Sequence, residues 1–116
     1  MILPHHHILA SGIAGAGKGL FLTQAVSAGC IIIAPDQIDR TYALEELRAR
    51  VDAASLEPSI VRWFGDRYTA NPDWPDECYV NHSFDPSGLW HLGFVFARQD
   101  LAAGTDVTVD SRHLLP

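Results

Sequence analysis

The 116-residue sequence contains very little lysine and cysteine. Lys18 is the single lysine, and a net charge of −6 argues against the basic surface that nucleic-acid-binding proteins carry. Cys30 and Cys78 form no CxxC pair and have no metal-ligand spacing, so we expect no metal site. Free thiols are expected, with a single disulfide as the alternative. The acidic charge permits a basic protein partner, although it is more often a solubility feature.

Long apolar runs are also missing. No stretch approaches the roughly 20 apolar residues that a membrane span needs, and the N-terminus lacks the regions of a signal peptide. We therefore expect a cytoplasmic protein without membrane contact. The length allows one domain over residues 1–116 but not two. Three histidines at 5–7 lie in an apolar segment, and metal binding there is a distant second to a strand, in which neighbours face opposite sides.

Short apolar segments between glycines and prolines predict a mostly-β fold. Strands are expected within 2–10, 20–23, 30–34, 89–97 and 107–109. A helix is expected over 41–54, because Thr41 is a candidate cap and Leu47 and Val51 have helical spacing. The apolar stretch 59–68 has no assignable type. Residues 71–76, with two prolines, predict a loop, and 111–116 a tail.

A glycine-rich loop covers residues 11–19. Its glycines permit left-handed dihedrals and the close approach of a ligand. Residues 12–18 have the spacing of a phosphate-binding loop, but Gly19 stands where Ser or Thr should bind the metal ion. The dinucleotide fingerprint fails because Leu20 occupies its third glycine position. Taken alone, this loop is best interpreted as a hairpin loop without a ligand, with nucleotide binding as a weaker alternative.

A polar triplet, Asn81-His82-Ser83, follows a short apolar segment and precedes Asp85-Pro86. Polar residues before Asp-Pro are typical of a surface turn. The alternative is a buried polar loop that holds a ligand, because all three side chains offer hydrogen-bonding groups. The triplet by itself leaves both interpretations open.

Three segments together resemble the SET domain of protein-lysine methyltransferases. They are residues 11–29 with the glycine loop, 79–86 with Asn-His-Ser, and 94–110 with the ending Asp-Val-Thr-Val-Asp. They occur in the family's order. The resemblance implies a SET-domain β-clip of short strands and small sheets, with a threaded pseudoknot, which is an exception to the rule against threaded loops. It also implies a variable, partly helical insert at about 37–76.

The resemblance further implies S-adenosylmethionine as cofactor and no metal. The backbone of the glycine loop would contact the methionine part, and the polar triplet would contact the adenine and methionine groups. Carried over to this sequence, the cofactor-binding residues are Ala16, Gly17, Lys18, Gly19, Leu20, Asn81 and His82.

The family's key tyrosine follows the Asp of the last motif, and Ser111 stands there in this sequence. Serine is too short to place an oxygen where a phenol would reach, and it has no ring to wall a lysine channel. The substitute candidates are Tyr42, Tyr68 and Tyr79. A homodimer is another way to complete the pocket. Its candidate interface aromatics are Trp63, Phe64, Trp74 and Trp90, although ordinary core packing is the more common role for such residues.

The leading hypothesis is an S-adenosylmethionine-dependent protein-lysine N-methyltransferase. The alternative is a catalytically weak or inactive cofactor-binding or interaction module, because Ser111 replaces the tyrosine and no C-terminal lid follows Pro116 in this sequence. A small nucleotide-binding protein of the phosphate-loop type is the third hypothesis. The enzyme is the leading hypothesis because the three motifs occur together and in the family's order.

Overall fold

The computed structural model describes residues 1–36 and 38–116, and it confirms a mostly-β protein with three small sheets. The first sheet contains β1 (His6–Ala10), β2 (Lys18–Leu22), β10 (Asp106–Val109) and β7 (Asn81–His82), in that order. The second contains β3 (Ile31–Ile33), β9 (Phe94–Ala97) and β8 (Gly88–His91). The third contains β4 (Tyr42–Ala43), β6 (Arg67–Thr69) and β5 (Val61–Phe64). The helices are α1 (Leu44–Arg48), α2 (Ala53–Leu56) and the 3-10 helices η1 (Glu57–Ser59), η2 (Asp76–Tyr79) and η3 (Ser111–His113).

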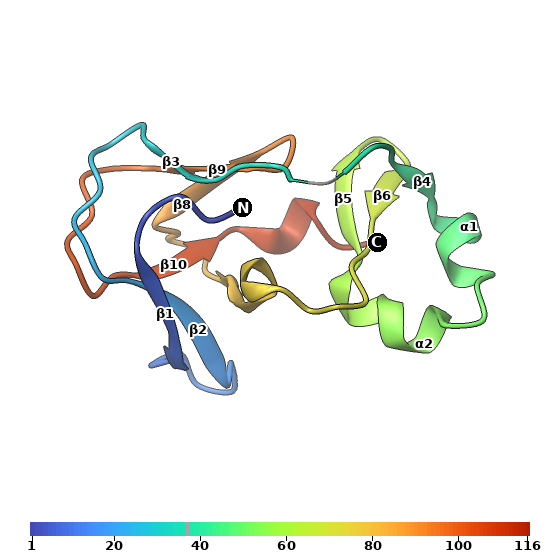
Figure 1. Cartoon of the computed structure of the whole chain (residues 1–116), viewed down its shortest axis with the longest axis horizontal. Coiled ribbons are helices and arrows are strands. Elements are labelled where there is room, and N and C mark those ends of the chain that lie inside the picture. Colours follow the sequence, from blue (N-terminus) through green and yellow to red (C-terminus); the bar gives the residue numbers. More distant parts are fainter. Residues whose placement is uncertain (37) are drawn as a thin grey trace.

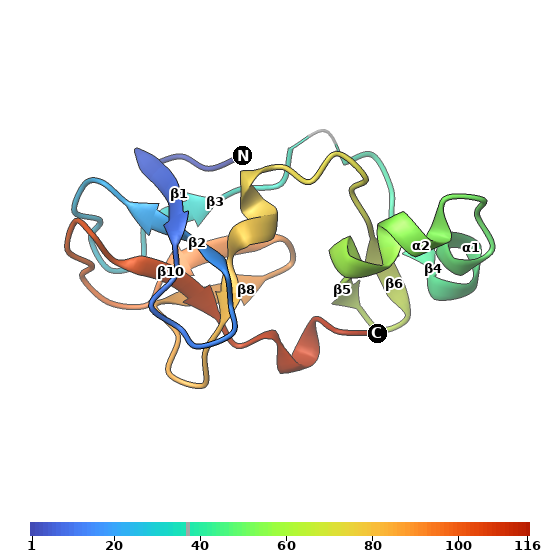
Figure 2. The same cartoon turned by 90° about the horizontal axis from the view of Figure 1, so that it is seen from below.

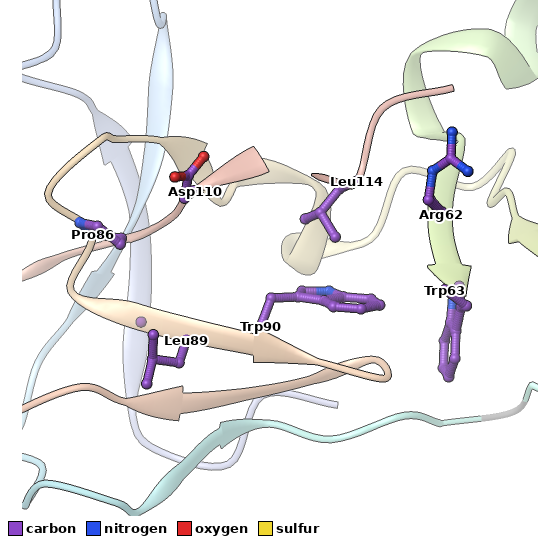
Figure 3. A pocket seen from close by; sticks show the side chains of 8 residues that line it. Arg62, Trp63, Pro86, Leu89, Trp90, Asp110 and Leu114 are labelled. Carbon is purple, nitrogen blue, oxygen red and sulfur yellow. The ribbon is translucent and has the colours of Figure 1, made fainter. Parts of the chain in front are cut away.

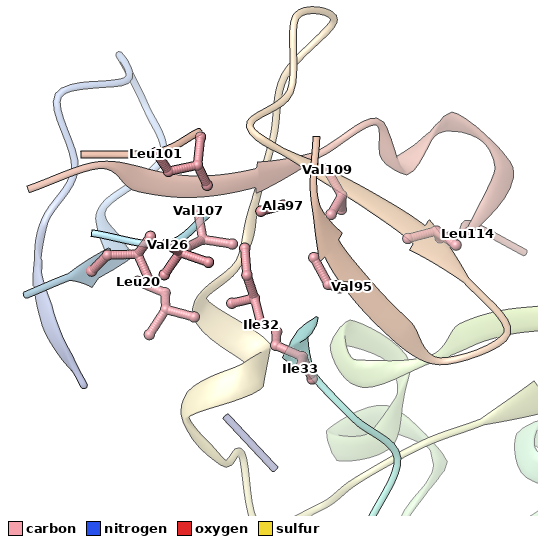
Figure 4. Close-up of a cluster of buried hydrophobic side chains, with 11 residues drawn as sticks. Leu20, Val26, Ile32, Ile33, Val95, Ala97, Leu101, Val107, Val109 and Leu114 are labelled. Carbon is pink, nitrogen blue, oxygen red and sulfur yellow. The ribbon is translucent and has the colours of Figure 1, made fainter. Parts of the chain in front are cut away.

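The first two sheets enclose the main core, and together they are called the main lobe here (Figure 4). Leu20 of β2 and Val107 of β10 pair across the first sheet, and both are fully buried. Ile32 of β3 and Val95 of β9 come from the second sheet and join the same cluster. These β-branched and leucine side chains suit a pleated, buried surface, which is why the short segments form strands.

The insert lobe, residues 42–69, combines the third sheet with α1 and α2. Figures 1 and 2 both show it at the end of the molecule away from the β1–β2 hairpin. Its apolar cluster is separate from the main core and consists of Leu47, Ile60 and Tyr68. The stretch of undecided type, 59–68, therefore supplies the last residue of η1, all of β5 and the start of β6.

The expected helix over 41–54 is wrong in its extent. Helix α1 begins at Leu44, after the two residues of β4, and ends at Arg48. Thr41 caps no helix: its hydroxyl accepts a hydrogen bond from Arg67, whereas the backbone N–H of Ala43 donates to the Glu46 carboxylate. Leu47 is buried but Val51 is fully exposed, so the two cannot lie on the apolar face of one continuous helix.

Two further expectations need correction. The stretch 89–97 is a hairpin of two strands, β8 and β9, with Leu92 and Gly93 at positive φ in the turn. Residues 111–116 are more than a tail, because they form η3 and place Leu114 in the main core. The loop over 71–76 is confirmed up to Pro75, after which η2 begins.

Both cysteines carry free thiols, with Cys30 exposed and Cys78 half-buried. Within residues 1–36 and 38–116, no helix has the length and apolar content that crossing a membrane would require.

Candidate functional site

The glycine-rich loop closes the hairpin between β1 and β2. The backbone N–H of Ser11 donates to the Gly17 carbonyl at 2.7 Å, which joins the two ends of the loop. Gly15 and Gly17 have φ values of 77° and 72°, so both occupy the left-handed region that side chains disfavour. The loop therefore has its shape because glycine stands at these positions.

Three strands of the first sheet converge on Gly19. A Cβ atom at this position would lie 2.8 Å from Oδ1 of Asp106 on β10 and 3.2 Å from Nδ2 of Asn81 on β7. The same Asn81 amide donates to the Lys18 carbonyl at 2.9 Å. The amide nitrogen of Asn81 makes this bond to β2, so the amide oxygen is available to accept a hydrogen bond from another group. The predicted residues Lys18, Gly19 and Asn81 are brought together.

Asp106 belongs to this site, although the sequence analysis did not select it. Its Oδ2 accepts a hydrogen bond from the Ser11 hydroxyl at 2.9 Å. Its Oδ1 is enclosed and has no hydrogen-bond partner among the described residues. Burial raises the pKa of the Asp106 carboxyl above its usual value, and the Ser11 hydrogen bond offsets part of that shift. The available sequence signal was its position, an acidic residue at the start of an apolar strand.

His82 is held by backbone and aromatic contacts. Its Nδ1 accepts a hydrogen bond from the Ser111 backbone N–H at 3.1 Å, which assigns the ring proton to Nε2 when His82 is neutral. The ring packs edge-to-face on Phe84 with centroids 4.4 Å apart. Asp110 lies 3.9 Å from Nδ1, and its hydrogen bonds with Arg112 lower the pKa of its carboxyl to about 2.

The position expected to hold a tyrosine is occupied by Ser111, at the start of η3. Its backbone contacts His82 as described above. The substitute tyrosines lie elsewhere. Tyr68 and Tyr42 pack in the apolar cluster of the insert lobe, and Tyr79 packs edge-to-face on Trp74. Within the described residues, no hydrogen bond joins any of the three phenol groups to Ser111 or His82.

A cavity of about 260 Å³ opens beside Asp110, between the two lobes (Figure 3). Trp90 of β8 and Trp63 of β5 both line it and pack on each other edge-to-face, with ring centroids 6.0 Å apart. The other lining residues are Arg62, Pro86, Gly88, Leu89, Asp110 and Leu114. None of the predicted cofactor-binding residues lines this cavity, so it is distinct from the cluster at Gly19.

The aromatics considered as interface residues divide into two pairs. Trp63 and Trp90 pack on each other at the junction of the lobes. Phe64 and Trp74 are 56% and 39% exposed.

Two other kinds of site were considered from the sequence, a phosphate-binding loop and a metal site at the histidine triplet. A phosphate-binding loop needs a helix after its lysine, but Lys18 begins strand β2, so the nucleotide-binding hypothesis is wrong. In the histidine triplet, Nε2 of His6 lies 3.0 Å from the Asp76 carboxylate, and strand β1 places neighbouring side chains on opposite faces. The part of the chain that the structure describes contains no group of His, Cys, Asp or Glu residues suited to a metal ion.

The sequence matches no family model and no curated protein. The fold, however, is similar to a chain in the structure of apo ctPRC2 with two mutations in Ezh2, with a TM-score of 0.72 and 14% identity. The match covers 97% of this chain and 16% of that chain, so the present chain spans about a sixth of its neighbour's length. The neighbour contains a SET domain, and the chain therefore has a SET-type β fold, as the three motifs predicted. At this level of identity the likeness shows the fold alone.

Proposed function

We propose that this chain binds S-adenosylmethionine and transfers its methyl group to a lysine side chain of a protein substrate. The observation that carries the proposal is the convergence of Gly19, Asn81 and Asp106 beneath the glycine loop, on a SET-type fold. Segments 11–29, 79–86 and 94–110, which resembled the family in sequence, supply one residue each to this cluster.

The residues of the cluster suit a compact, charged ligand. Glycine at position 19 lets the Asp106 carboxylate and the Asn81 amide lie close to the β2 backbone, which gathers polar groups beside the glycine loop. The amide oxygen of Asn81 would accept a hydrogen bond from the ligand's ammonium group. When bound, S-adenosylmethionine supplies a methyl group that its sulfonium makes electrophilic.

The cavity beside Asp110 is the proposed entrance for the acceptor lysine. Methyl transfer requires a neutral amine that is aligned with the methyl group and shielded from water. Trp63 and Trp90 would provide the shielding, since Ser111 has no ring.

A homodimer that completes the pocket remains a prediction. Light scattering on the purified protein tests it, because it gives the molar mass in solution.

The second candidate is a cofactor-binding or interaction module without turnover. It is favoured by the placement of Ser111, whose backbone is engaged by His82 while Tyr42, Tyr68 and Tyr79 pack elsewhere. A module would bind the cofactor as the enzyme does, but no phenol would help to position the amine.

Calorimetry tests the shared step, cofactor binding. The wild-type chain should bind S-adenosylmethionine, and Asn81→Ala should weaken binding at least about tenfold, because a hydrogen bond to a charged group and the anchor on Lys18 are both lost. Asn71→Ala, in an exposed loop, is the matched control and should bind as the wild type does. If neither the cofactor nor its demethylated product binds, both candidates fail.

Transfer of labelled methyl groups to lysine-rich proteins separates the candidates. Trp90→Ala should reduce transfer about tenfold or more while cofactor affinity stays unchanged, since Trp90 lines the cavity and the predicted cofactor-binding residues do not. Val51→Ala shortens a fully exposed side chain of the insert lobe and should leave both quantities unchanged. Cofactor binding without any transfer would favour the module.

A further inference from the structure

Asp106 carries the one enclosed side-chain polar atom without a partner among the described residues. Its other oxygen is bound only by the neutral Ser11 hydroxyl. The carboxylate lies against the Cα of Gly19, in the middle of the cluster proposed to hold the cofactor. An enclosed acceptor without a donor is uncommon in folded proteins, and each case calls for an explanation.

The charge of Asp106 is also uncompensated. Within residues 1–36 and 38–116, no ion pair involves this carboxylate. On β2 the nearest cationic residue in sequence is Lys18, whose side chain is exposed. On β7 the polar neighbours are the neutral Asn81 and then His82, whose Nδ1 is engaged by the Ser111 backbone. The cluster therefore has a net negative field that the protein itself does not cancel.

We infer that the Asp106 carboxylate makes this site select the positively charged cofactor over its neutral demethylated product. The inference rests on the proposed function. S-adenosylmethionine has an ammonium, a carboxylate and a sulfonium, for a net charge of +1. The product has a thioether in place of the sulfonium and a net charge of zero. A fixed negative charge beneath the loop attracts the first ligand and is indifferent to the second, which favours exchange after each turnover.

A purely structural role explains Asp106 less well. Burying a carboxylate without a cation costs stability, and an amide of the same shape would fill the same space without that cost. The raised pKa of Asp106 shows that the surroundings disfavour its charged form. Because Coulomb attraction acts over several ångströms in a partly enclosed site, the enclosed Oδ1 need not touch the ligand to discriminate between the two charges.

Calorimetric titration of the wild-type chain with three ligands tests the inference. The ligands are S-adenosylmethionine, its demethylated product, and an analogue with an ammonium in place of the sulfonium. A unit charge about 10 Å away in such a site corresponds to roughly tenfold in affinity, so the two cationic ligands should bind about tenfold more tightly than the product. Equal or tighter binding of the product would overturn the inference, and this measurement needs no variant.

Variants then assign the effect to the charge. Asp106→Asn keeps the shape and should reduce the preference to within about twofold. Ser11→Ala removes the hydrogen bond but keeps the charge, so it should retain the preference. Asp66→Asn removes a fully exposed charge in the insert lobe and should retain it as well. A folded Asp106→Asn protein with the wild-type preference would overturn the inference, whereas loss of all binding in the wild type would overturn the proposed function instead.

Discussion

At the residue scale, the buried charge of Asp106 lowers the stability of the folded protein. Its folded-state pKa lies above the usual value of 3.8, so between these two values the folded protein binds more protons than the unfolded chain. The stability that this group contributes is therefore present below about pH 3.8 and is lost as pH rises through the folded pKa. At neutral pH the carboxylate is a net burden on the fold.

Asp106→Asn should therefore stabilise the protein at pH 7, by at most about 1 kcal/mol, because solvent screens a partly exposed residue. Urea denaturation at pH 7 and at pH 3.5 measures the change, which should shrink at the lower pH. Asp66→Asn, which is fully exposed, should change stability by less than about 0.5 kcal/mol at either pH. Equal destabilisation of Asp106→Asn at both pH values would contradict this account.

The two cysteines should differ in reactivity. Burial, aided by the Glu77 carboxylate, raises the pKa of the Cys78 thiol to about 11, whereas Cys30 is exposed. Since the thiolate is the reactive form, Cys78 should react with a disulfide reagent at pH 8 at least about tenfold more slowly than Cys30. Cys30→Ser should leave only the slow phase. In urea the two thiols should react alike; a single fast phase for both in the folded protein would contradict the placement of Cys78.

Residue-level prediction from sequence succeeded where a motif carried the information. The short patterns around Gly19 and Asn81 identified residues that do meet in the structure. Asp106 was missed because its polar partner, Ser11, is 95 residues away, and nothing local to the strand marks that pairing. Ser111 was located by position, but its backbone contact with His82 depends on η3, which the pattern did not predict.

At the scale of elements, the strands were easier to predict than the helices. The strands supply most of the buried core, so each appears in the sequence as a short run of apolar residues. The helical segment failed because Leu47 and Val51 have helical spacing but only Leu47 packs in the insert lobe. Short helices of this kind take their length from tertiary packing, because their own hydrogen bonds barely offset nucleation.

The turn between β8 and β9 packs against the insert lobe. Gly93 has a φ of 85°, and a Cβ atom there would overlap the ring of Trp63 on β5. Gly93→Ala should therefore cost about 2–4 kcal/mol, from strain in the backbone and displacement of the tryptophan. Urea denaturation followed by tryptophan fluorescence measures this loss.

Gly104→Ala is the matched control for that turn. Gly104 has a similar φ of 91°, but the space around its would-be Cβ is open. The substitution should cost only the backbone strain, about 1 kcal/mol. If the two variants were equally unstable, the contact between Trp63 and the turn would contribute nothing.

At the scale of the whole molecule, the C-terminal segment joins the two lobes. After β10, the chain forms η3 and inserts Leu114 into the main core. The carbonyl of the same residue accepts a hydrogen bond from the Arg62 backbone N–H of β5 at 2.7 Å. Leu114 also lines the cavity beside Asp110, so one residue connects the core, the insert lobe and the proposed lysine entrance.

Leu114→Ala should cost about 2–4 kcal/mol, because it leaves a void in a packed core. It should also lower methyl transfer more than cofactor affinity, since the cavity loses a wall while the Gly19 cluster is untouched. Leu115→Ala, 60% exposed and one residue further on, should change stability by less than about 0.5 kcal/mol. Chemical denaturation and cofactor calorimetry on both variants make the comparison. Equal effects of the two substitutions would mean that the segment is a tail, as its sequence suggested, and that the Leu114 side chain does not join the lobes.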